Sequence, residues 1–472
     1  MNDMLNNLFE KWCGQSANNL DPLPQSGSNR KYFRLSSAKY SAIGVYNTDM
    51  RENEAFFSFS RSLLDGGIKV PRLYAIDNNY NIYLQEDLGD ETLFSLLTRE
   101  RAANGGNFTP HLINIYKKII ADLVEIQHVG RQKVDFSKCY PRDAFDSQSM
   151  TWDLNYFKYY FLKLAHIPFD EQYLENDFQT LIKYLLQTDC GYFLYRDFQS
   201  RNIMIVNDIP YYIDYQGGRR GALQYDVASL LYDAKADIPT EVRKELLAEY
   251  VKHLNPAEQQ TFTQYYYAYV LIRIMQAMGA YGYRGFFERK THFLRSIPFA
   301  INNLREILQE GLPIEIPELR KALEAVCNNE DLQNISKSGR LTVHVSSFSY
   351  KHGIPNDNSG NGGGFVFDCR ALPNPGRYEQ YKQLTGRDDE VKKFFDGVKQ
   401  EMNVFLEAAY SVVGQSVKRY VERGFTNLSV SFGCTGGQHR SVFCADSMAE
   451  WLRRNFDVDI DLRHWEQKQL NR

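Results

Sequence analysis

A short strand–loop–hairpin pattern in the middle of the chain constrains the fold more than any other feature. Residues 192–194 and 203–206 are apolar, strand-like runs on either side of a loop that carries Asp197 and Asn202. A third apolar run ends directly at Asp214. Short apolar and aromatic runs bounded by polar residues are typical of strands and hairpins. We therefore predict a loop and a hairpin that bring these three polar side chains together.

The spacing of these side chains indicates the chemistry of phosphoryl transfer from ATP. Asp197 would accept the proton of the attacking hydroxyl, while Asn202 and Asp214 would hold Mg²⁺ against the phosphates. The simpler alternative is an ordinary surface loop in which Asp and Asn side chains cap turns. The downstream strand that ends at Asp214 and the intervening hairpin favour the phosphotransferase site, with ATP and Mg²⁺ as cofactors.

Length, charge and cysteine usage bound the remaining possibilities. The chain has 472 residues, too many for one hydrophobic core, so two or three domains are expected. A formal net charge of -3 gives no bulk electrostatic reason to bind nucleic acid or an anionic membrane. The seven cysteines are scattered and form no C-x-x-C pair, which argues for a reducing compartment without disulfides or structural zinc.

Neither the start of the chain nor its most apolar stretch predicts a membrane segment. Residues 1–5 lack the positive region and apolar core of a signal peptide. Residues 265–278 are interrupted by Arg273 and are too short to span a bilayer. We therefore expect a cytoplasmic protein without a membrane partner.

The pattern along the chain predicts four parts. Residues 1–90 alternate turn signals with short strands around one helix at 52–64, which indicates a small sheet lobe with a strand edge at Val70-Pro71. Residues 91–312 have helical periodicity and form a helical lobe around the central motif. A linker is predicted over 313–338, and a further domain over 339–472.

The last part alternates strands with helices. Strands are predicted at 341–345, 365–370 and 428–432, and helices at 391–423 and 441–454. This alternation favours a separate α/β domain with a largely parallel sheet.

The first two parts resemble the aminoglycoside phosphotransferase family, relatives of the protein kinases, and within it the AmgK type. Kinases of that type phosphorylate N-acetylmuramate and N-acetylglucosamine at the anomeric hydroxyl, in cell-wall recycling. The stretches that carry the resemblance are 22–34, 67–71, 86–89, 195–202, 213–216 and 225–230. The resemblance implies an α+β, protein-kinase-like bilobal domain ahead of the α/β domain, and an amino-sugar substrate.

The same resemblance assigns roles to individual residues. Asp197 would be the catalytic base, and Asn202 and Asp214 the metal ligands. A turn would cover the ATP phosphates with its backbone amides, and a hinge would meet adenine. The candidate ATP-binding residues of this turn, its flank and the hinge are Ser26, Gly27, Ser28, Asn29, Arg30, Arg34, Gln85, Glu86, Asp87 and Leu88.

Two departures from the family pattern bear on activity. Tyr195 stands where these kinases usually have His, and we expect a structural substitution in which the tyrosine packs and donates a hydrogen bond. The usual strand lysine that grips the phosphates is missing from residues 42–47, and Arg30, Lys31 or Arg34 would have to supply the charge. Without such a group, this half would be a weak kinase or a nucleotide-binding pseudokinase.

Other polar and aromatic residues of the helical lobe have simpler interpretations. Asp226 stands at the start of a predicted helix and is expected to cap it. The acceptor pocket is expected near Trp152, Asp153, Tyr156 and Tyr159, where core packing is the default for each aromatic side chain.

Residues 429–442 form a second motif, a strand, a glycine-containing loop and a helix. Such a loop directs successive amides and a helix N-terminus at one point, and His439 and Arg440 add donors, which predicts a phosphate-binding site. The alternative is a tight turn whose glycines serve backbone geometry alone. The segment also matches the C-x-x-G-x-x-R loop of cysteine-dependent phosphatases, but a buried, unreactive Cys434 is the favoured interpretation.

The last part also resembles the C-terminal domain of the RNase adaptor protein RapZ. The matching stretches are 347–355, 367–375, 385–388 and 433–442. That domain is implicated in sensing glucosamine-6-phosphate and in binding a small RNA. The candidate sugar-phosphate contacts are His352, Asp368, Arg370, Cys434, Thr435, Gly436, Gly437, His439, Arg440 and Ser441.

The sequence thus favours an amino-sugar kinase fused to a domain that binds a phosphorylated amino sugar. The P-loop of the RapZ family is absent, and the tail at 466–472 is much less basic than a strong RNA-binding tail, so RNA is the less favoured partner. One alternative is a nucleotide-binding pseudokinase that acts as an adaptor for RNA or protein. Another is a C-terminal phosphatase that uses Cys434.

Overall fold

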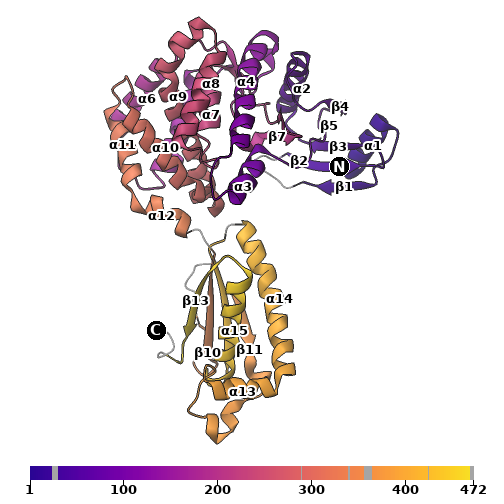
Figure 1. Cartoon of the computed structure of the whole chain (residues 1–472), viewed down its shortest axis with the longest axis vertical. Coiled ribbons are helices and arrows are strands. Elements are labelled where there is room, and N and C mark those ends of the chain that lie inside the picture. Colours follow the sequence, from indigo (N-terminus) through magenta and orange to yellow (C-terminus); the bar gives the residue numbers. More distant parts are fainter. Residues whose placement is uncertain (24–29, 289, 339–340, 356–363, 424, 468–472) are drawn as a thin grey trace. The chain divides into compact units, whose positions relative to one another are not determined.

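The computed structural model describes residues 1–23, 30–288, 290–338, 341–355, 364–423 and 425–467, and it divides into two compact units (Figure 1). The first unit comprises Met1–Ala280 with Phe299–Asn329, and the second comprises Tyr281–Pro298 with Glu330–Arg472. The range 313–338, predicted to be a linker, contains helices α11 (Pro317–Asn328) and α12 (Glu330–Ser338).

The first unit begins with a five-stranded antiparallel sheet in the order β1-β2-β3-β5-β4. Its strands are β1 (Asn19–Pro22), β2 (Lys31–Ser36), β3 (Ser41–Tyr46), β4 (Leu73–Ile76) and β5 (Ile82–Glu86). Helix α1 (Asn2–Cys13) packs Leu5 and Phe9 against Phe33 and Leu35 on one face of the sheet. The predicted strand edge at Val70-Pro71 is wrong by a few residues, because the proline has no amide for a ladder and β4 begins at Leu73.

Helix α2 (Met50–Asp65) covers the predicted helix, and Asp49 caps its N-terminus. The Asp49 side chain accepts hydrogen bonds from the amides of Arg51 and Glu52, which satisfies two of the free donors at the helix start. This cap fixes where the first turn of α2, with Glu52, begins.

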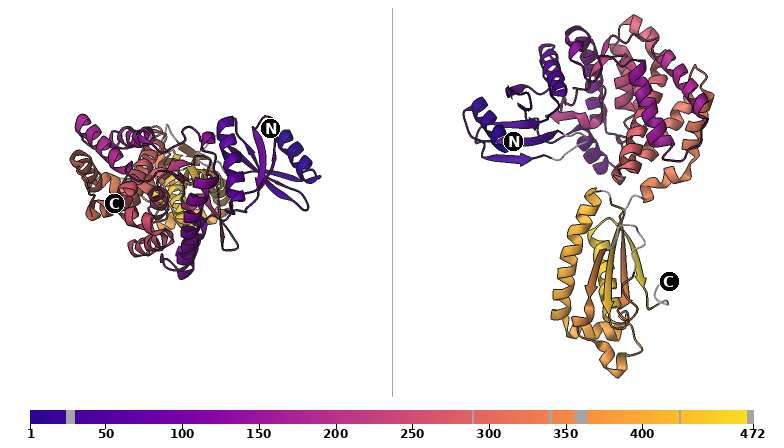
Figure 2. Two further views of the ribbon diagram at one scale, coloured as in Figure 1. Left: turned by 90° about the horizontal axis from the view of Figure 1, so that it is seen from above. Right: turned by 180° about the vertical axis from the view of Figure 1, so that it is seen from behind.

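The rest of the first unit is a helical lobe beside this sheet (Figures 1 and 2). Its helices are α3 (Leu93–Ala103), α4 (Pro110–Lys133), α5 (Ser147–Phe157), α6 (Glu171–Leu185), α7 (Leu223–Leu231), α8 (Thr240–His253), α9 (Pro256–Gly282), α10 (Ile297–Glu310) and α11. Along α4, the apolar positions from Leu112 to Ile126 are buried at helical spacing, as the sequence predicts. None of the helices in the described ranges is both long and apolar enough to cross a membrane.

Two small antiparallel pairs lie within the helical lobe and carry the central motif. Strand β6 (Tyr192–Leu194) pairs with β9 (Arg219–Gly221), and β7 (Ile203–Val206) forms a hairpin with β8 (Ile209–Tyr212). The predicted strand–loop–hairpin is therefore confirmed.

The second unit contains a four-stranded sheet in the order β11-β12-β10-β13, and every pairing in it is parallel. The strands are β10 (Thr342–Ser349), β11 (Gly364–Asp368), β12 (Asn427–Cys434) and β13 (Asp459–His464), and the helices beside them are α13 (Asp389–Gly397), α14 (Lys399–Arg423) and α15 (Arg440–Asn455). The predicted α/β domain with a parallel sheet is confirmed. The single helix predicted over 391–423 is wrong, because the chain breaks at Val398, directly after Gly397, which favours helix least among non-proline residues.

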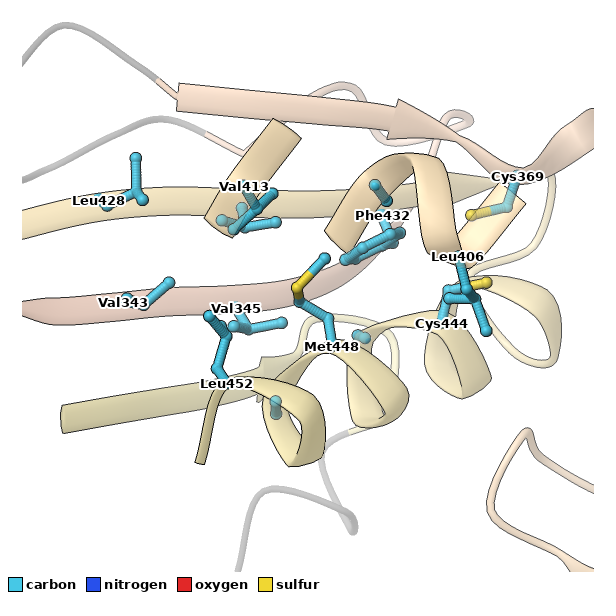
Figure 3. Close-up of a cluster of buried hydrophobic side chains, with 14 of the residues drawn as sticks. Val343, Val345, Cys369, Leu406, Val413, Leu428, Phe432, Cys444, Met448 and Leu452 are labelled. Atoms are coloured by element: carbon cyan, nitrogen blue, oxygen red, sulfur yellow. The ribbon is translucent and has the colours of Figure 1, made fainter. Parts of the chain in front are cut away.

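The core of this second unit lies on one face of its sheet. Val345 and Phe432 from the strands meet Val413 of α14 and Met448 of α15 (Figure 3). Both long helices therefore pack on the same face, and the loop between β12 and α15 emerges at the carboxyl ends of the strands.

Candidate active site

The central hairpin brings the three predicted side chains together. The Asn202 amide Nδ2 donates to the Asp197 carbonyl oxygen at 2.9 Å and to Asp214 Oδ2 at 3.3 Å. Asn202 directly precedes β7, and the amide of Ile213, directly after β8, donates to the Asn202 carbonyl at 3.0 Å. The β7–β8 register therefore places Asn202 opposite the residue before Asp214.

Asp214 has an uncommon backbone conformation and a raised side-chain pKa. Its φ of 69° lies in the left-handed region, which is uncommon outside glycine. Its Oδ1 accepts a hydrogen bond from Gln216 Nε2 at 2.7 Å. Burial raises the pKa of Asp214, the charge of Asp197 adds to that rise, and the Gln216 hydrogen bond opposes it. Two carboxylates that repel each other in this way would be stabilised by a cation between them.

The donor set fits Mg²⁺ held together with nucleotide phosphates. Within the described ranges, no group of three or more His, Cys, Asp or Glu side chains could hold a metal alone. Mg²⁺ commonly takes one or two carboxylates, with phosphate and water oxygens completing its shell. With Nδ2 of Asn202 engaged, its Oδ1 and the Asp214 carboxylate supply protein oxygens of the required kind.

A buried carboxylate, to which the sequence analysis gave a different role, holds the loop that carries Asp197. Asp226 is fully buried, and it accepts hydrogen bonds from the amides of Tyr195 at 2.7 Å and Arg196 at 3.0 Å. The prediction that Asp226 caps its own helix is wrong, because α7 begins three residues earlier and Asp226 lies inside its first turn. Arg196 has a φ of 84°, so these two bonds fix a strained backbone directly before Asp197.

Tyr195 connects the loop that carries Asp197 to the segment that carries Asp214. Its ring is buried, and its hydroxyl donates to the Ile213 carbonyl at 2.5 Å. The expected structural role for this tyrosine, packing with a donated hydrogen bond, is confirmed. The bond joins the residue two positions before Asp197 to the residue directly before Asp214.

The residues considered for the acceptor pocket have different environments. Asp153 forms two hydrogen bonds with the Arg196 guanidinium, at 2.6 and 2.7 Å, so it braces the loop from α5. Trp152 is 48% exposed and Tyr159 is 46% exposed, so the default of core packing is wrong for these two side chains. Their rings lie at the surface of α5 and of the turn that follows it.

The candidate hinge, residues 85–88, is joined to Arg34 of β2 by ion pairs and hydrogen bonds. Arg34 donates to both carboxylate oxygens of Asp87, at 2.9 and 3.1 Å, and also to Asp90. Hydrogen bonds from Ser41 and Arg34 outweigh burial and lower the pKa of Asp87. Gln85 and Glu86 end β5, and Asp87 and Leu88 follow it. The hinge is therefore positioned by Arg34, whose charge is already matched by two carboxylates.

The candidate phosphate turn is described only at its end. Ser26, Gly27, Ser28 and Asn29 lie outside the described residues. Arg30 is described and is 2% exposed, and its guanidinium forms an ion pair with Glu52 of α2 at 3.3 Å.

In the second unit, the loop after β12 lines a cavity of about 240 Å³. Its walls are Asn374, Gly376, Lys382, Cys434, Thr435, Gly436, Gln438, His439 and Arg440. Five of these were predicted as sugar-phosphate contacts, whereas Asn374, Gly376, Lys382 and Gln438 were not. Gln438 stood inside the 429–442 motif and Asn374 inside the matching stretch 367–375, so both could have been found there. Lys382 comes from a segment without such a signal.

Arg440 is the cavity's buried cation. It is 5% exposed, and its Nη1 donates to the carbonyl oxygens of Arg370 at 2.9 Å and Leu372 at 3.1 Å. Its Nε is buried and has no hydrogen-bond partner within the described part of the chain. Because Arg440 is also the first residue of α15, the guanidinium and the helix N-terminus favour an anion at the same place.

The other residues predicted as sugar-phosphate contacts do not line this cavity. Ser441 is buried with its Oγ 3.1 Å from Cys434 Sγ, and Cys434 is 3% exposed, as expected for a buried thiol. Gly437 has a φ of 64°, which accounts for glycine at that turn. His352, Asp368 and Arg370 do not line the cavity: His352 pairs with Glu466, and Asp368 pairs with Arg370 at the surface.

Comparison with known proteins finds one family match for the N-terminal half of the chain and another for the C-terminal half. Residues 20–261 match the family model described as the phosphotransferase enzyme family, and residues 341–468 match the model of the RapZ C-terminal domain. A "nucleotide-binding protein" from Thermosipho africanus is 33% identical over 195 residues, which cover 37% of this chain and 65% of that relative. The chain spans 56% and 53% of the length of two other such proteins, from Thermosipho melanesiensis and Fusobacterium nucleatum.

Solved structures show similarity at low sequence identity. A choline kinase from Cryptosporidium parvum has a TM-score of 0.46 and 12% identity, covering 69% of this chain and 100% of that one. An ADP-bound aminoglycoside phosphotransferase, APH(2'')-Ib, has a TM-score of 0.43 and 13% identity, covering 71% and 99%. The family model itself extends over more than half of the chain and includes Asp197, Asn202 and Asp214. The chain therefore belongs to the phosphotransferase enzyme family.

Proposed function

We propose that this chain is an ATP- and Mg²⁺-dependent kinase that phosphorylates a hydroxyl of an amino sugar, of the N-acetylmuramate or N-acetylglucosamine type. The observation that carries this proposal is the Asn202 amide, which joins the Asp197 main chain to the Asp214 carboxylate. This contact holds a proton acceptor and a metal-binding pair in fixed positions relative to each other.

Each residue of this site has a distinct role in the proposed reaction. Asp197 accepts the proton of the sugar hydroxyl as that oxygen bonds to the γ-phosphorus of ATP, while the bond from this phosphorus to the β–γ bridging oxygen breaks and ADP leaves. Asn202 and Asp214 hold Mg²⁺, which neutralises charge on the phosphates when it is bound. Asp226 and Tyr195 keep Asp197 and Asp214 in place through the hydrogen bonds described above.

The amino-sugar class is supported by the agreement of two independent resemblances. The first unit resembles kinases of N-acetylmuramate and N-acetylglucosamine. The second matches the RapZ C-terminal domain, and the resemblance to that domain implies sensing of glucosamine-6-phosphate. We infer that the second unit binds a sugar phosphate of this kind in the cavity lined by Thr435, Gly436, His439 and Arg440, and that it regulates the kinase.

The deciding experiment compares Asp197→Asn with the unchanged chain in an ATP-consumption assay. The substrates are N-acetylmuramate, N-acetylglucosamine and free glucosamine, each with and without glucosamine-6-phosphate. Loss of the general base should lower turnover by roughly 10²- to 10⁴-fold and leave ATP binding nearly intact.

A matched control is Asp65→Asn, which removes the same charge at the exposed end of α2. That variant should turn over sugar like the unchanged protein. Undiminished sugar phosphorylation by Asp197→Asn would end the kinase assignment.

A second candidate function is a nucleotide-binding adaptor, which one observation favours. On the face of the sheet that points away from α1, strand β3 carries Ile43 and Val45. No lysine therefore extends from that strand toward the nucleotide side. An adaptor that uses RNA would bind it through phosphate contacts, with affinity that falls steeply as salt rises. Filter binding across a salt series, together with no sugar turnover, would identify this function.

A further inference from the structure

Helix α1 covers one face of the N-terminal sheet, so we expect a cation that binds the ATP phosphates to lie on the opposite face. Phe33 and Leu35 of β2 pack in the core with α1, so strand alternation places Tyr32 and Arg34 on the opposite face. A Cβ on Gly44 of β3 would meet Leu35 and Leu5, which confirms that alternation on the neighbouring strand. Lys31 is exposed. It stands two residues before Phe33 in the same strand, so its side chain lies on the same face as Phe33, the α1 side.

The other candidate cation on the nucleotide side is already engaged. Arg34 forms ion pairs with Asp87 at 2.9 Å and with Asp90 at 2.8 Å. It also donates to the Gly89 carbonyl at 3.2 Å. Two carboxylates match its single charge, so Arg34 organises the hinge instead of supplying a net positive charge to phosphates.

Arg30 has a different environment, beside α2 and near the segment that carries Asp214 and Tyr215. Its guanidinium carbon lies 5.9 Å from the centre of the Phe56 ring, and that ring stacks at 5.1 Å on Tyr215, the residue after Asp214. One aromatic ring, that of Phe56, thus lies between Arg30 and the residue that follows Asp214.

Glu52 is fixed as the partner of Arg30. Its Oε1 lies 3.3 Å from the Arg30 guanidinium, and its Oε2 accepts a hydrogen bond from Asn47 Nδ2 at 2.9 Å. Asn47 also donates to Asn53 Oδ1 at 3.1 Å, within the same first turns of α2. The carboxylate is therefore held in one orientation, and it orients the buried guanidinium in turn.

We propose that Arg30, oriented by Glu52, binds the β- and γ-phosphates of ATP in place of the missing strand lysine. Protein kinases use a lysine on a strand and a glutamate on the following helix for this purpose. Here the glutamate is on α2, as in that arrangement, but the cation comes from the residue that precedes β2. The inference rests on the proposed function only in requiring that the first unit binds ATP.

The test measures nucleotide affinity by calorimetry for adenosine, AMP, ADP and ATP, with Mg²⁺, on the full chain. In Arg30→Met, affinity for ATP and ADP should fall roughly 10- to 100-fold, the size expected for one charge-assisted hydrogen bond. Affinity for adenosine should be unchanged. Arg30→Lys should recover part of the loss, and Glu52→Gln should weaken ATP binding less than Arg30→Met.

Lys31→Met is the matched control, because it removes the same charge one residue away on the opposite face. It should bind all four ligands like the unchanged chain, and thermal unfolding of each variant verifies that it is folded. Equal loss for adenosine and ATP in a folded Arg30→Met, or equal losses in Arg30→Met and Lys31→Met, would overturn the inference. A chain that binds ATP through Arg30 but phosphorylates no sugar would contradict the proposed function alone.

Discussion

Asp226→Asn tests whether a buried carboxylate on α7 holds the catalytic loop. Asp226 accepts hydrogen bonds from the amides of Tyr195 and Arg196, and an asparagine oxygen can replace only one of these acceptors. Losing one charge-assisted bond and leaving one buried amide without a partner costs roughly 1.5–3 kcal/mol. If this cost raises the activation free energy because Asp197 is no longer held in place, turnover falls roughly 10- to 100-fold. The KM for ATP changes little.

The same substitution has a pH signature. Burial raises the pKa of Asp226 to about 7, although the two amides oppose the rise. The unfolded chain has a carboxyl pKa of about 3.9, so the folded protein binds this proton more tightly. The stabilisation by neutral Asp226 is therefore complete at low pH and is lost as the pH rises through the folded pKa. Between about pH 5 and pH 8, the unchanged protein should lose roughly 2–3 kcal/mol of unfolding free energy relative to Asp226→Asn.

Steady-state kinetics and urea unfolding across that pH range measure both quantities. Asp177→Asn is the control, because Asp177 is 7% exposed and accepts a hydrogen bond from the Leu319 amide at 2.8 Å, away from the catalytic loop. It should lower stability and leave turnover unchanged. Parallel pH curves for the unchanged protein and Asp226→Asn, together with equal turnover, would refute the assignment.

Two further predictions concern the two binding regions. Tyr195→Phe removes the hydroxyl that donates to the Ile213 carbonyl; stability should fall by about 1 kcal/mol, and turnover should fall while the ATP affinity measured by calorimetry changes little. An unaltered turnover number would show that this link does not position the site. Arg440→Met removes the buried cation of the second cavity; glucosamine-6-phosphate affinity should fall roughly 10- to 100-fold, with kinase turnover in the absence of that ligand unchanged. Titration calorimetry measures this affinity, and equal values for the two proteins would exclude Arg440 as the phosphate contact.

Local patterns made the central motif predictable. Asn202 and Asp214 flank a hairpin of adjacent strands, so the apolar runs and the polar residues at their ends were sufficient to place them together. The parallel sheet of the second unit was predictable for a similar reason, because alternating strands and helices favour it. Tyr195 could be assigned a structural role because its size and hydroxyl are visible in the sequence.

Contacts between distant segments could not be predicted in this way. Asp226 follows the loop amides that it binds by about thirty residues, and a capping position was the simplest local interpretation. The choice among Arg30, Lys31 and Arg34 depends on strand parity and on partners from α2 and the hinge. Lys382 reaches the second cavity from a segment whose residues carry no chemical pattern of their own.

The division of the chain has a practical consequence for dissecting this protein. The polypeptide leaves the first unit after Ala280, returns at Phe299 and leaves again after Asn329. A protease would have to cleave three connections, not one, to release the two bodies from each other. A truncation at residue 312 would discard α11, which belongs to the first body, and would keep Tyr281–Pro298 without the remainder of its own.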